Sequence, residues 1–268
     1  MKKVAFVSGW YVFNGQKGIH PIHKFVLECL YKSAKKFFLK EHNVDFIFIT
    51  NDETIKIDDV KNVVINHKVD GFWYMCLMKI LSLKYLEEEY DYIFVNDTDQ
   101  IFVNEIGDEL LKDNFYLLNH FYYPTIESIY RDITPPVEKN DIVPLNFENK
   151  NDYWTMGNFF GGKSELMKNL CSFTETQHNL YVREKYHPDF HFYTRYPEEL
   201  FLIKYIYENK ISHTRLHANG NPKATGMNYF MGDFYDKENI YPNIPEIRII
   251  HNTKKNVELL KEIMQFYS

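Results

Sequence analysis

The stretch YIFVNDTDQIF at residues 92–102 joins a short apolar run to a polar segment that carries two aspartates. Residues 92–95 are aromatic and β-branched, which is typical of a buried strand. Asp97 and Asp99 follow that strand directly, one residue apart. Two carboxylates in such a position can share a hard cation such as Mn²⁺ or Mg²⁺, and water and substrate phosphates complete its coordination. The stretch therefore predicts a strand whose end holds a divalent metal beside a phosphorylated ligand.

Two other interpretations of the aspartate pair stay open. The pair could only cap a turn. A strand followed by DxDx(T/V) is also typical of phosphatases in which the first aspartate is a nucleophile, although Ile101 stands where that pattern has Thr or Val.

Segments with strand-like and helix-like patterns alternate on both sides of this stretch. Besides residues 92–95, we expect strands at 3–7, 44–50, 63–66 and 246–250, and helices at 24–38, 72–86, 165–181 and 198–208. This order predicts an α/β fold with a mostly parallel sheet flanked by helices. Ligands of such sheets bind beyond the carboxyl ends of the strands, where Ser8-Gly9 and Asp97-Thr98-Asp99 fall.

The composition excludes several classes of protein. The chain has 268 residues, of which 45% are hydrophobic and 25% charged, which rules out a disordered, collagen-like or disulfide-scaffold protein. Its net charge of −6 argues against nucleic acid as a partner. Aromatic residues make up 17% of the chain, enough both to fill a core and to line a sugar or nucleotide site.

The cysteines and the hydropathy suggest a location. Three widely spaced cysteines without a CxxC pair predict a reduced, cytoplasmic protein and not a zinc site. No apolar run approaches the roughly 20 residues of a membrane span, and the short apolar start fits a first strand better than a signal peptide. We therefore expect a cytoplasmic protein, with peripheral contact at the inner face of a membrane left open.

Three further segments are candidates for ligand binding. In YWTMGNFFGG, residues 153–162, the glycines allow backbone to approach a ligand closely, although a glycine-rich turn beside an aromatic core has the same pattern. In RYPEELFLIKYI, residues 195–206, Pro197 suits the first turn of a helix, and Glu198 and Glu199 then lie beside the positive end of its dipole. An ionised carboxylate there can act at an anomeric carbon or only stabilise the helix. In HNTKKN, residues 251–256, two lysines could bind a diphosphate or form an ordinary solvated charge run.

Taken in order, these segments resemble the retaining glycosyltransferases of family six, which include the histo-blood-group A and B transferases, the α1,3-galactosyltransferases and their bacterial relatives. Residues 33–50 are similar to the first helix and following strand of that family, and Asp97-Thr98-Asp99-Gln100-Ile101-Phe102 to its DVD motif. Residues 156–162 resemble its donor loop, and residues 196–205 align with its WHDESHLNKY helix. The lack of a membrane stem suggests a bacterial-type member.

The resemblance implies one GT-A-like, Rossmann-like domain over residues 1–268. Its nucleotide-binding half would cover residues 1–105, its donor and acceptor half 106–250, and a closing tail 251–268. It also implies the following roles: Glu199 catalytic; Asp97 and Asp99 as metal ligands; Ser8, Gly9, Tyr11, Lys79, Asp97, Thr98, Asp99, Met156, Gly157, Asn158 and Lys254 in donor binding; His120, Tyr196 and Glu198 in acceptor binding.

The activity implied is the transfer of galactose or N-acetylgalactosamine from a UDP-sugar to an oligosaccharide or glycolipid acceptor, with retention of the α configuration and help from Mn²⁺ or Mg²⁺. The sequence departs from the family where Lys79 replaces an arginine, Phe72-Trp73-Tyr74 replaces Trp-Gln-Asp, and Pro197-Glu198 replaces His-Asp. Asn158 in place of a smaller residue leans towards galactose. An inverting GT-A transferase, a metal-dependent phosphatase and a non-catalytic carbohydrate-binding protein remain as alternatives.

Overall fold

A seven-stranded sheet forms the centre of the computed structural model. The structure describes residues 1–13, 15–119, 155–184, 197–216, 218–219, 231–233, 249–251 and 257–266. The strands of this sheet are β1 (Lys3–Trp10), β2 (Asn43–Thr50), β3 (Lys61–Val64), β4 (Tyr92–Asn96), β6 (Phe115–Asn119), β7 (Thr155–Lys163) and β8 (Thr214–Leu216).

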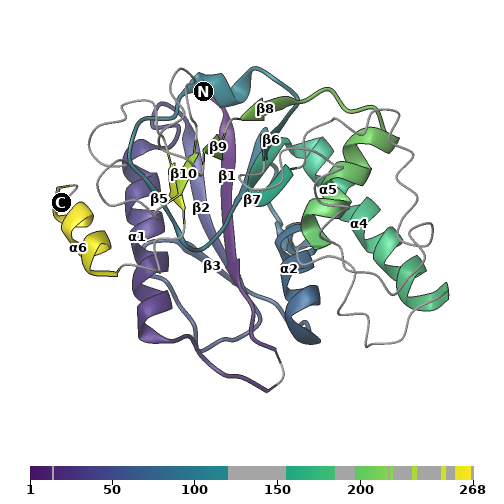
Figure 1. Ribbon diagram of the computed structural model, residues 1–268, viewed down its shortest axis with the longest axis horizontal. Coiled ribbons are helices and arrows are strands. Elements are labelled where there is room, and N and C mark those ends of the chain that lie inside the picture. The colour runs from purple at the N-terminus through teal and green to yellow at the C-terminus, as the bar shows by residue number, and fades with distance from the viewer. Residues whose placement is uncertain are drawn as a thin grey trace.

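The order of the strands across this sheet is β3-β2-β1-β4-β7-β6-β8 (Figure 1). Neighbouring strands pair in parallel, except that β7 runs antiparallel to both β4 and β6. The helices are α1 (Pro21–Phe37), α2 (Gly71–Leu81), α4 (Ser164–Glu184), α5 (Pro197–Glu208) and α6 (Val257–Phe266), with 3-10 turns η1 (Ser82–Tyr85) and η2 (Asp108–Leu111). The expected α/β fold with a mostly parallel sheet flanked by helices is therefore confirmed.

A second, smaller sheet begins just after the aspartate pair. It consists of β5 (Gln100–Phe102), β11 (Ile249–His251), β10 (Met231–Asp233) and β9 (Ala218–Asn219), in the order β5-β11-β10-β9. β5 pairs antiparallel with β11, so that Gln100 lies opposite His251. The turn that carries the two aspartates is thus the passage from one sheet to the other.

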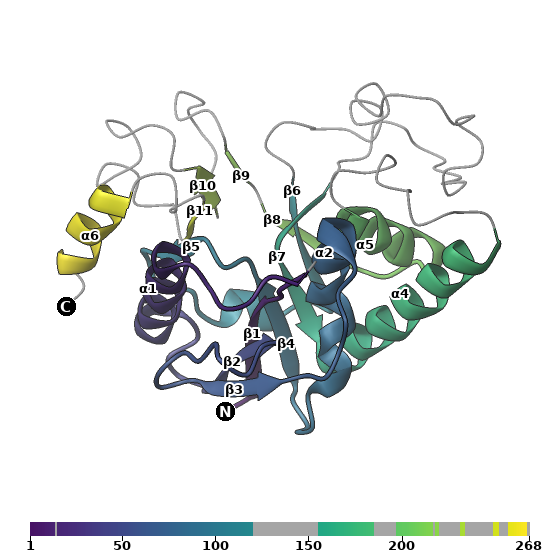
Figure 2. The ribbon, with the colours of Figure 1, turned by 90° about the horizontal axis from the view of Figure 1, so that it is seen from below.

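The helices cover the two faces of the main sheet (Figure 2). Alternate residues of β1 face opposite sides: Ala5 and Val7 pack with α2, α4 and α5, whereas Val4 and Phe6 pack with α1. α6 lies outside α1, with Leu260 and Met264 buried one helical turn apart. This arrangement gives two apolar clusters, one on each side of the sheet.

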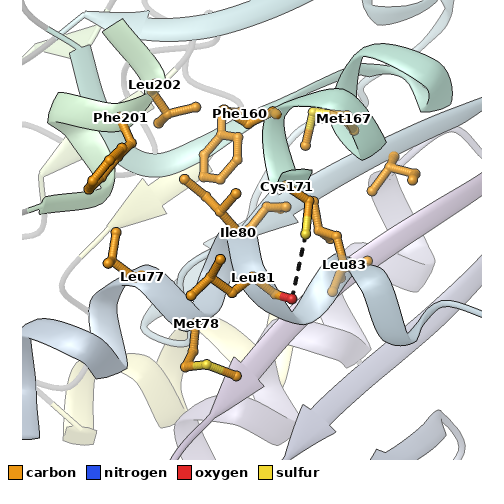
Figure 3. Packing of buried hydrophobic residues seen from close by; sticks show 14 of the residues in the cluster. Leu77, Met78, Ile80, Leu81, Leu83, Phe160, Met167, Cys171, Phe201 and Leu202 are labelled. Atoms are coloured by element: carbon orange, nitrogen blue, oxygen red, sulfur yellow. Dashed lines mark hydrogen bonds between the residues drawn. The ribbon is translucent and has the colours of Figure 1, made fainter. Parts of the chain in front are cut away.

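An apolar cluster beside α2 attaches β7, α4 and α5 to the first half of the chain. Leu77, Ile80 and Leu81 of α2 interleave with Phe160 of β7 and with side chains of α4 and α5 (Figure 3). The thiol of Cys171 lies 3.6 Å from the carbonyl oxygen of Leu81. All three cysteines are buried and unpaired.

Most of the expected elements are present, and three of the differences bear on the site. β1 continues through Ser8-Gly9 to Trp10, and the helix expected at 72–86 ends at Leu81 and tightens into η1. Residues 156–162, which the resemblance implies to be a donor loop, belong to strand β7. A Cβ on Gly161 would collide with the backbone of β4, and one on Gly162 with the backbone carbonyl of Asn114, so these glycines permit close strand pairing and do not mark a loop.

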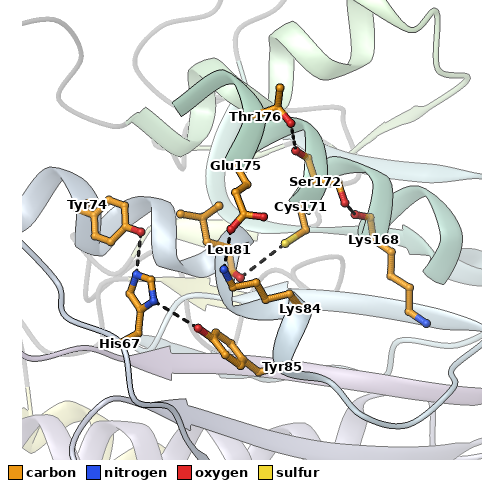
Figure 4. A network of polar contacts seen from close by, with 10 residues as sticks. All are labelled: His67, Tyr74, Leu81, Lys84, Tyr85, Lys168, Cys171, Ser172, Glu175 and Thr176. Atoms are coloured by element: carbon orange, nitrogen blue, oxygen red, sulfur yellow. Dashed lines mark hydrogen bonds and ion pairs between the residues drawn. The ribbon is translucent and has the colours of Figure 1, made fainter. Parts of the chain in front are cut away.

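A polar network joins α2, η1 and α4 (Figure 4). The His67 ring lies between two tyrosines, with Nε2 2.8 Å from the Tyr74 hydroxyl and Nδ1 3.3 Å from the Tyr85 hydroxyl. Lys84 of η1 pairs with Glu175 of α4 at 2.7 Å. Burial lowers the pKa of His67, and the nearby Lys84 lowers it further. Burial likewise lowers the pKa of His178, whose ring packs on Tyr74.

No helix in the described part of the chain is both long and apolar enough to cross a bilayer.

The lowered pKa values of His67 and His178 predict acid sensitivity. The unfolded chain binds protons at these positions near pH 6.5, whereas the native state does not until a lower pH. The native state should therefore have its full free energy of unfolding above about pH 6.5, and this free energy should decrease as the pH falls below that value. Urea titrations between pH 7.5 and pH 5.5 should show a shallower decrease for the double variant His67→Asn/His178→Asn than for the wild type. An equal decrease in both would contradict the prediction.

Candidate functional site

A bulge in β7 brings the glycine-rich segment to the end of β4. In its pairing with β6, Phe160 lies opposite Leu117 but Met156 lies opposite Leu118, so residues 157–159 have no partners there. On the other side, Phe159 pairs with Asn96, and the backbone N–H of Asp97 donates to the carbonyl oxygen of Asn158 at 2.8 Å. Bulges of this kind redirect the chain beside functional sites. Here the bulge places Gly157 and Asn158 against the aspartate turn.

The aspartate turn is attached to this bulge at both of its ends. The side-chain amide of Gln100 donates to the same carbonyl oxygen of Asn158 at 2.8 Å. Within the turn, Asp97 and Thr98 are partly exposed, whereas Asp99 is 5% exposed. The carboxylates of Asp97 and Asp99 therefore belong to a segment that is fixed to β7.

Lys79 of α2 connects the turn to α5. Its ammonium lies 2.6 Å from Asp97 Oδ1 and 3.0 Å from Glu198 Oε1, with the Gly157 carbonyl oxygen at 3.4 Å. Burial alone would lower the pKa of Lys79, but the charges of Asp97 and Glu198 outweigh burial and hold its pKa well above the usual value. Lys79 is therefore a fixed positive charge at the junction of α2, β4, β7 and α5.

Glu198 reaches Lys79 because residue 157 is a glycine. A Cβ on Gly157 would lie 2.5 Å from Glu198 Cγ, too close for any side chain to be accommodated without moving the glutamate. Glu198 is 2% exposed, and its second oxygen, Oε2, has no hydrogen-bond partner in the described part of the chain. A buried carboxylate oxygen without a donor is costly, which suggests that a ligand supplies the donor.

Glu199 contacts the same glycine from the next position of α5. The N–H of Gly157 donates to Glu199 Oε1 at 3.2 Å, and Glu199 is 3% exposed. Pro197 begins α5, so both glutamates lie in its first turn, beside the positive end of the helix dipole. Two adjacent carboxylates are thereby directed to one point of the β7 bulge.

Three of the residues expected at the donor lie at the end of β1 or just after it: Ser8, Gly9 and Tyr11. Ser8 is buried, and Tyr11 is 4% exposed because its ring folds back beneath Gly9. A Cβ on Gly9 would lie 2.5 Å from the Tyr11 hydroxyl, so the glycine makes room for that ring. Burial raises the pKa of Tyr11, while the Ser82 hydroxyl and the Lys79 charge partly offset the effect. The ring packs in the core on the α2 side of the sheet.

Comparison with known proteins assigns the chain to a family. The sequence model of glycosyltransferase family 6 matches residues 3–215. The chain belongs to glycosyltransferase family 6. Membership confirms the family that the motifs predict and agrees with the expected class of enzyme, a glycosyltransferase.

A curated relative agrees with the family assignment. The chain is 25% identical, over 202 residues, to globoside alpha-1,3-N-acetylgalactosaminyltransferase 1 of Gallus gallus. The match covers 67% of this chain and 57% of the relative. The chain therefore spans little more than half the length of this relative.

The residues present suit the divalent metal that is common in glycosyltransferase family 6. Asp97 and Asp99 offer hard oxygen ligands at the end of β4. In the part of the chain that the structure describes, no group of three or more His, Cys, Asp or Glu side chains could hold a metal. Two carboxylates completed by substrate phosphates and water are a usual way to bind Mg²⁺, so the pair fits such a metal.

The structure brings together most of the predicted site residues of this family 6 chain. Glu198, expected at the acceptor, contacts Lys79 and Gly157, which were expected at the donor. Met156 and Asn158 are largely buried beside them. His120, Tyr196 and Lys254 lie outside the described residues. The hydrogen bond from Gln100 to Asn158 was not predicted, because no sequence pattern identifies the partner of a glutamine side chain that follows the aspartate pair.

Removal of the Lys79 charge should destabilise the native state strongly. The substitution Lys79→Met leaves two close carboxylates without a cation in a largely buried place, which typically costs about 3–5 kcal/mol of unfolding free energy. Urea unfolding followed by circular dichroism measures this loss. Lys168→Met is a matched control, because Lys168 pairs with Glu89 on the surface, and it should cost far less. Equal, small losses in both variants would show that the Lys79 pairs do not stabilise the site.

Proposed function

We propose that this chain is a retaining glycosyltransferase that moves galactose or N-acetylgalactosamine from a UDP-sugar to an acceptor glycan in α linkage. One observation carries the proposal: Lys79, Asp97, Glu198 and Glu199 meet at the β7 bulge, in a chain of glycosyltransferase family 6. A carbohydrate-binding protein without activity would have no need of two carboxylates on one lysine with a third carboxylate on the neighbouring glycine.

The leaving group would lie at the ends of β1 and β4. The backbone at Ser8 and Gly9 would contact the nucleoside, with Tyr11 supporting it from beneath. Asp97 and Asp99 would hold Mn²⁺ or Mg²⁺ against the diphosphate, with Thr98 between them. The bound cation would supply positive charge that offsets the negative charge of the departing UDP.

The donor sugar would lie over the β7 bulge. Glu198 Oε2 is buried without a partner in the described structure, so a hydroxyl of the donor sugar, or of the acceptor that the resemblance places at Glu198, can donate a hydrogen bond to it. The Lys79 ammonium fixes the other oxygen, Oε1, at 3.0 Å and thereby orients the carboxylate. Met156, Gly157 and Asn158 would form the wall against the sugar ring. Asn158 leaves less room than a glycine would, which favours galactose, whereas the relative is named for N-acetylgalactosamine.

Glu199 would lie nearest the reacting carbon. The N–H of Gly157 holds its carboxylate in place, and the helix dipole favours the ionised form. An ionised carboxylate there can attack the anomeric carbon or stabilise an oxocarbenium-like transition state. Either role would require the negative charge of Glu199.

The remaining roles rest on the resemblance in sequence. Lys254 would stabilise the leaving UDP, and His120 and Tyr196 would contact an oligosaccharide or glycolipid acceptor. We also propose that the protein works in the cytoplasm.

The nucleotide and metal assignment predicts coupled binding. In titration calorimetry, UDP should bind the wild type more tightly with Mn²⁺ than without it. Asp99→Asn should weaken the Mn²⁺-dependent binding by about tenfold or more, because a metal ligand loses its charge. A carbohydrate-binding protein would respond to neither UDP nor Mn²⁺. Release of phosphate from simple esters without an acceptor would indicate a phosphatase, and a β-linked product by NMR would indicate an inverting transferase.

The catalytic assignment predicts that Glu199→Gln separates binding from turnover. UDP affinity should stay at the wild-type value, and turnover should fall by about 10²-fold or more, because the carboxylate charge at the reacting carbon is lost. Glu165→Gln is a matched control, because Glu165 is exposed in the first turn of α4. It removes the same kind of dipole interaction and should leave turnover unchanged. A Glu199→Gln variant that loses binding and stability together would instead assign the residue a folding role.

A further inference from the structure

Gln100 is a buried polar residue whose side chain joins two parts of the site. It is fully buried at the start of β5, followed by the buried apolar residues Ile101 and Phe102. Its amide nitrogen donates to the Asn158 carbonyl oxygen at 2.8 Å. Its amide oxygen is buried without a partner in the described structure. An amide that is only half satisfied is a poor contributor to stability, so its burial calls for another explanation.

The Asn158 carbonyl oxygen accepts two hydrogen bonds from the aspartate turn. The first comes from the N–H of Asp97 and the second from Gln100, both at 2.8 Å. A carbonyl oxygen has two lone pairs, so both bonds can form together. One peptide group of the β7 bulge therefore binds the first and the last residue of the segment Asp97-Thr98-Asp99-Gln100.

The other side of this segment is fixed independently. The N–H of Phe102 donates to the Ser33 hydroxyl of α1 at 3.0 Å, and Gln100 lies opposite His251 in the pairing of β5 with β11. The residues that follow Asp99 are thus fixed on two sides. The backbone of β5 is anchored to α1 and β11, and the side chain of Gln100 is anchored to β7. If the Gln100 contact were lost, the Asp97 N–H would still hold the start of the turn, but the hydrogen bond that fixes its end to the β7 bulge would be gone.

We infer that Gln100 is a positioning residue that sets the two aspartate carboxylates relative to the β7 bulge. This inference rests on the proposed function, because it assigns those carboxylates to a metal. Gln100 would contact neither metal nor sugar and would act through Asp99 and Asn158. A residue that orients metal ligands from outside the coordination shell commonly changes metal affinity by about 10- to 100-fold when it is replaced.

The test compares Gln100→Met with the wild type and with Asn62→Leu. Methionine keeps the length and the packing of glutamine but donates no hydrogen bond. Asn62 is the matched control, because its amide donates to the carbonyl oxygens of Ile57 and Val60 and it belongs to β3, the edge strand three positions away from β4. Circular dichroism and thermal unfolding establish that each variant folds. UDP titrations with and without Mn²⁺, and electron paramagnetic resonance of free Mn²⁺, then measure metal binding.

We expect Gln100→Met to weaken Mn²⁺ binding in the presence of UDP by about 10-fold or more, with the affinity for UDP alone unchanged. Asn62→Leu should match the wild type in both. Wild-type Mn²⁺ affinity in Gln100→Met would overturn the inference, and so would an equal loss of UDP binding with and without Mn²⁺. If Gln100→Met does not fold, the same criteria apply to Gln100→Asn, whose amide is one methylene too short. A wild type that binds UDP without regard to Mn²⁺ would instead refute the proposed function.

Discussion

The site depends on one ammonium group that two carboxylates share. Lys79 holds Asp97 at 2.6 Å and Glu198 at 3.0 Å, and these residues come from three different parts of the fold. Without that positive charge the two acidic groups would repel each other in a place with little water to screen them. This shared charge links the start of α5, which carries Glu199, to the end of β4.

The close contact also depends on backbone geometry. The bulge at residues 157–159 turns β7 towards the aspartate turn, and the absence of a side chain at Gly157 lets Glu198 approach. The same residue provides an N–H for Glu199 and a carbonyl oxygen near Lys79. Main-chain groups of one glycine thus contact two charged side chains, Glu199 and Lys79, and its missing side chain leaves room for a third, Glu198. The electrostatics of the site therefore depend on the shape of a single strand.

The sequence predicted the fold well where local patterns decide it. The apolar run before Asp97 and the helical spacing of residues 24–38 produced elements close to the observed ones, because hydrophobic period and strand propensity act over a few residues. The glycines of the segment 153–162 were also compatible with a turn, and the resemblance implied a donor loop at residues 156–162. In the structure, Gly161 and Gly162 are required by neighbouring strands that are distant in sequence, and no local pattern reveals such neighbours. The contact of Glu198 with Lys79 also joins residues that are distant in sequence. The sequence therefore suggested Asp97, Glu198 and Glu199 as candidates but did not predict this contact.

The reversed direction of β7 has a consequence for how such a chain can diversify. Because β7 runs against β4, α4 begins at the edge of the sheet remote from Lys79 and the aspartate turn, where the Ser164 N–H donates to the Asp91 carbonyl oxygen. α5 starts at the opposite end of β4, beside Lys79. Residue changes at the start of α4 therefore do not touch the charged residues at the start of α5, so that this part of the framework and the charged cluster can vary separately.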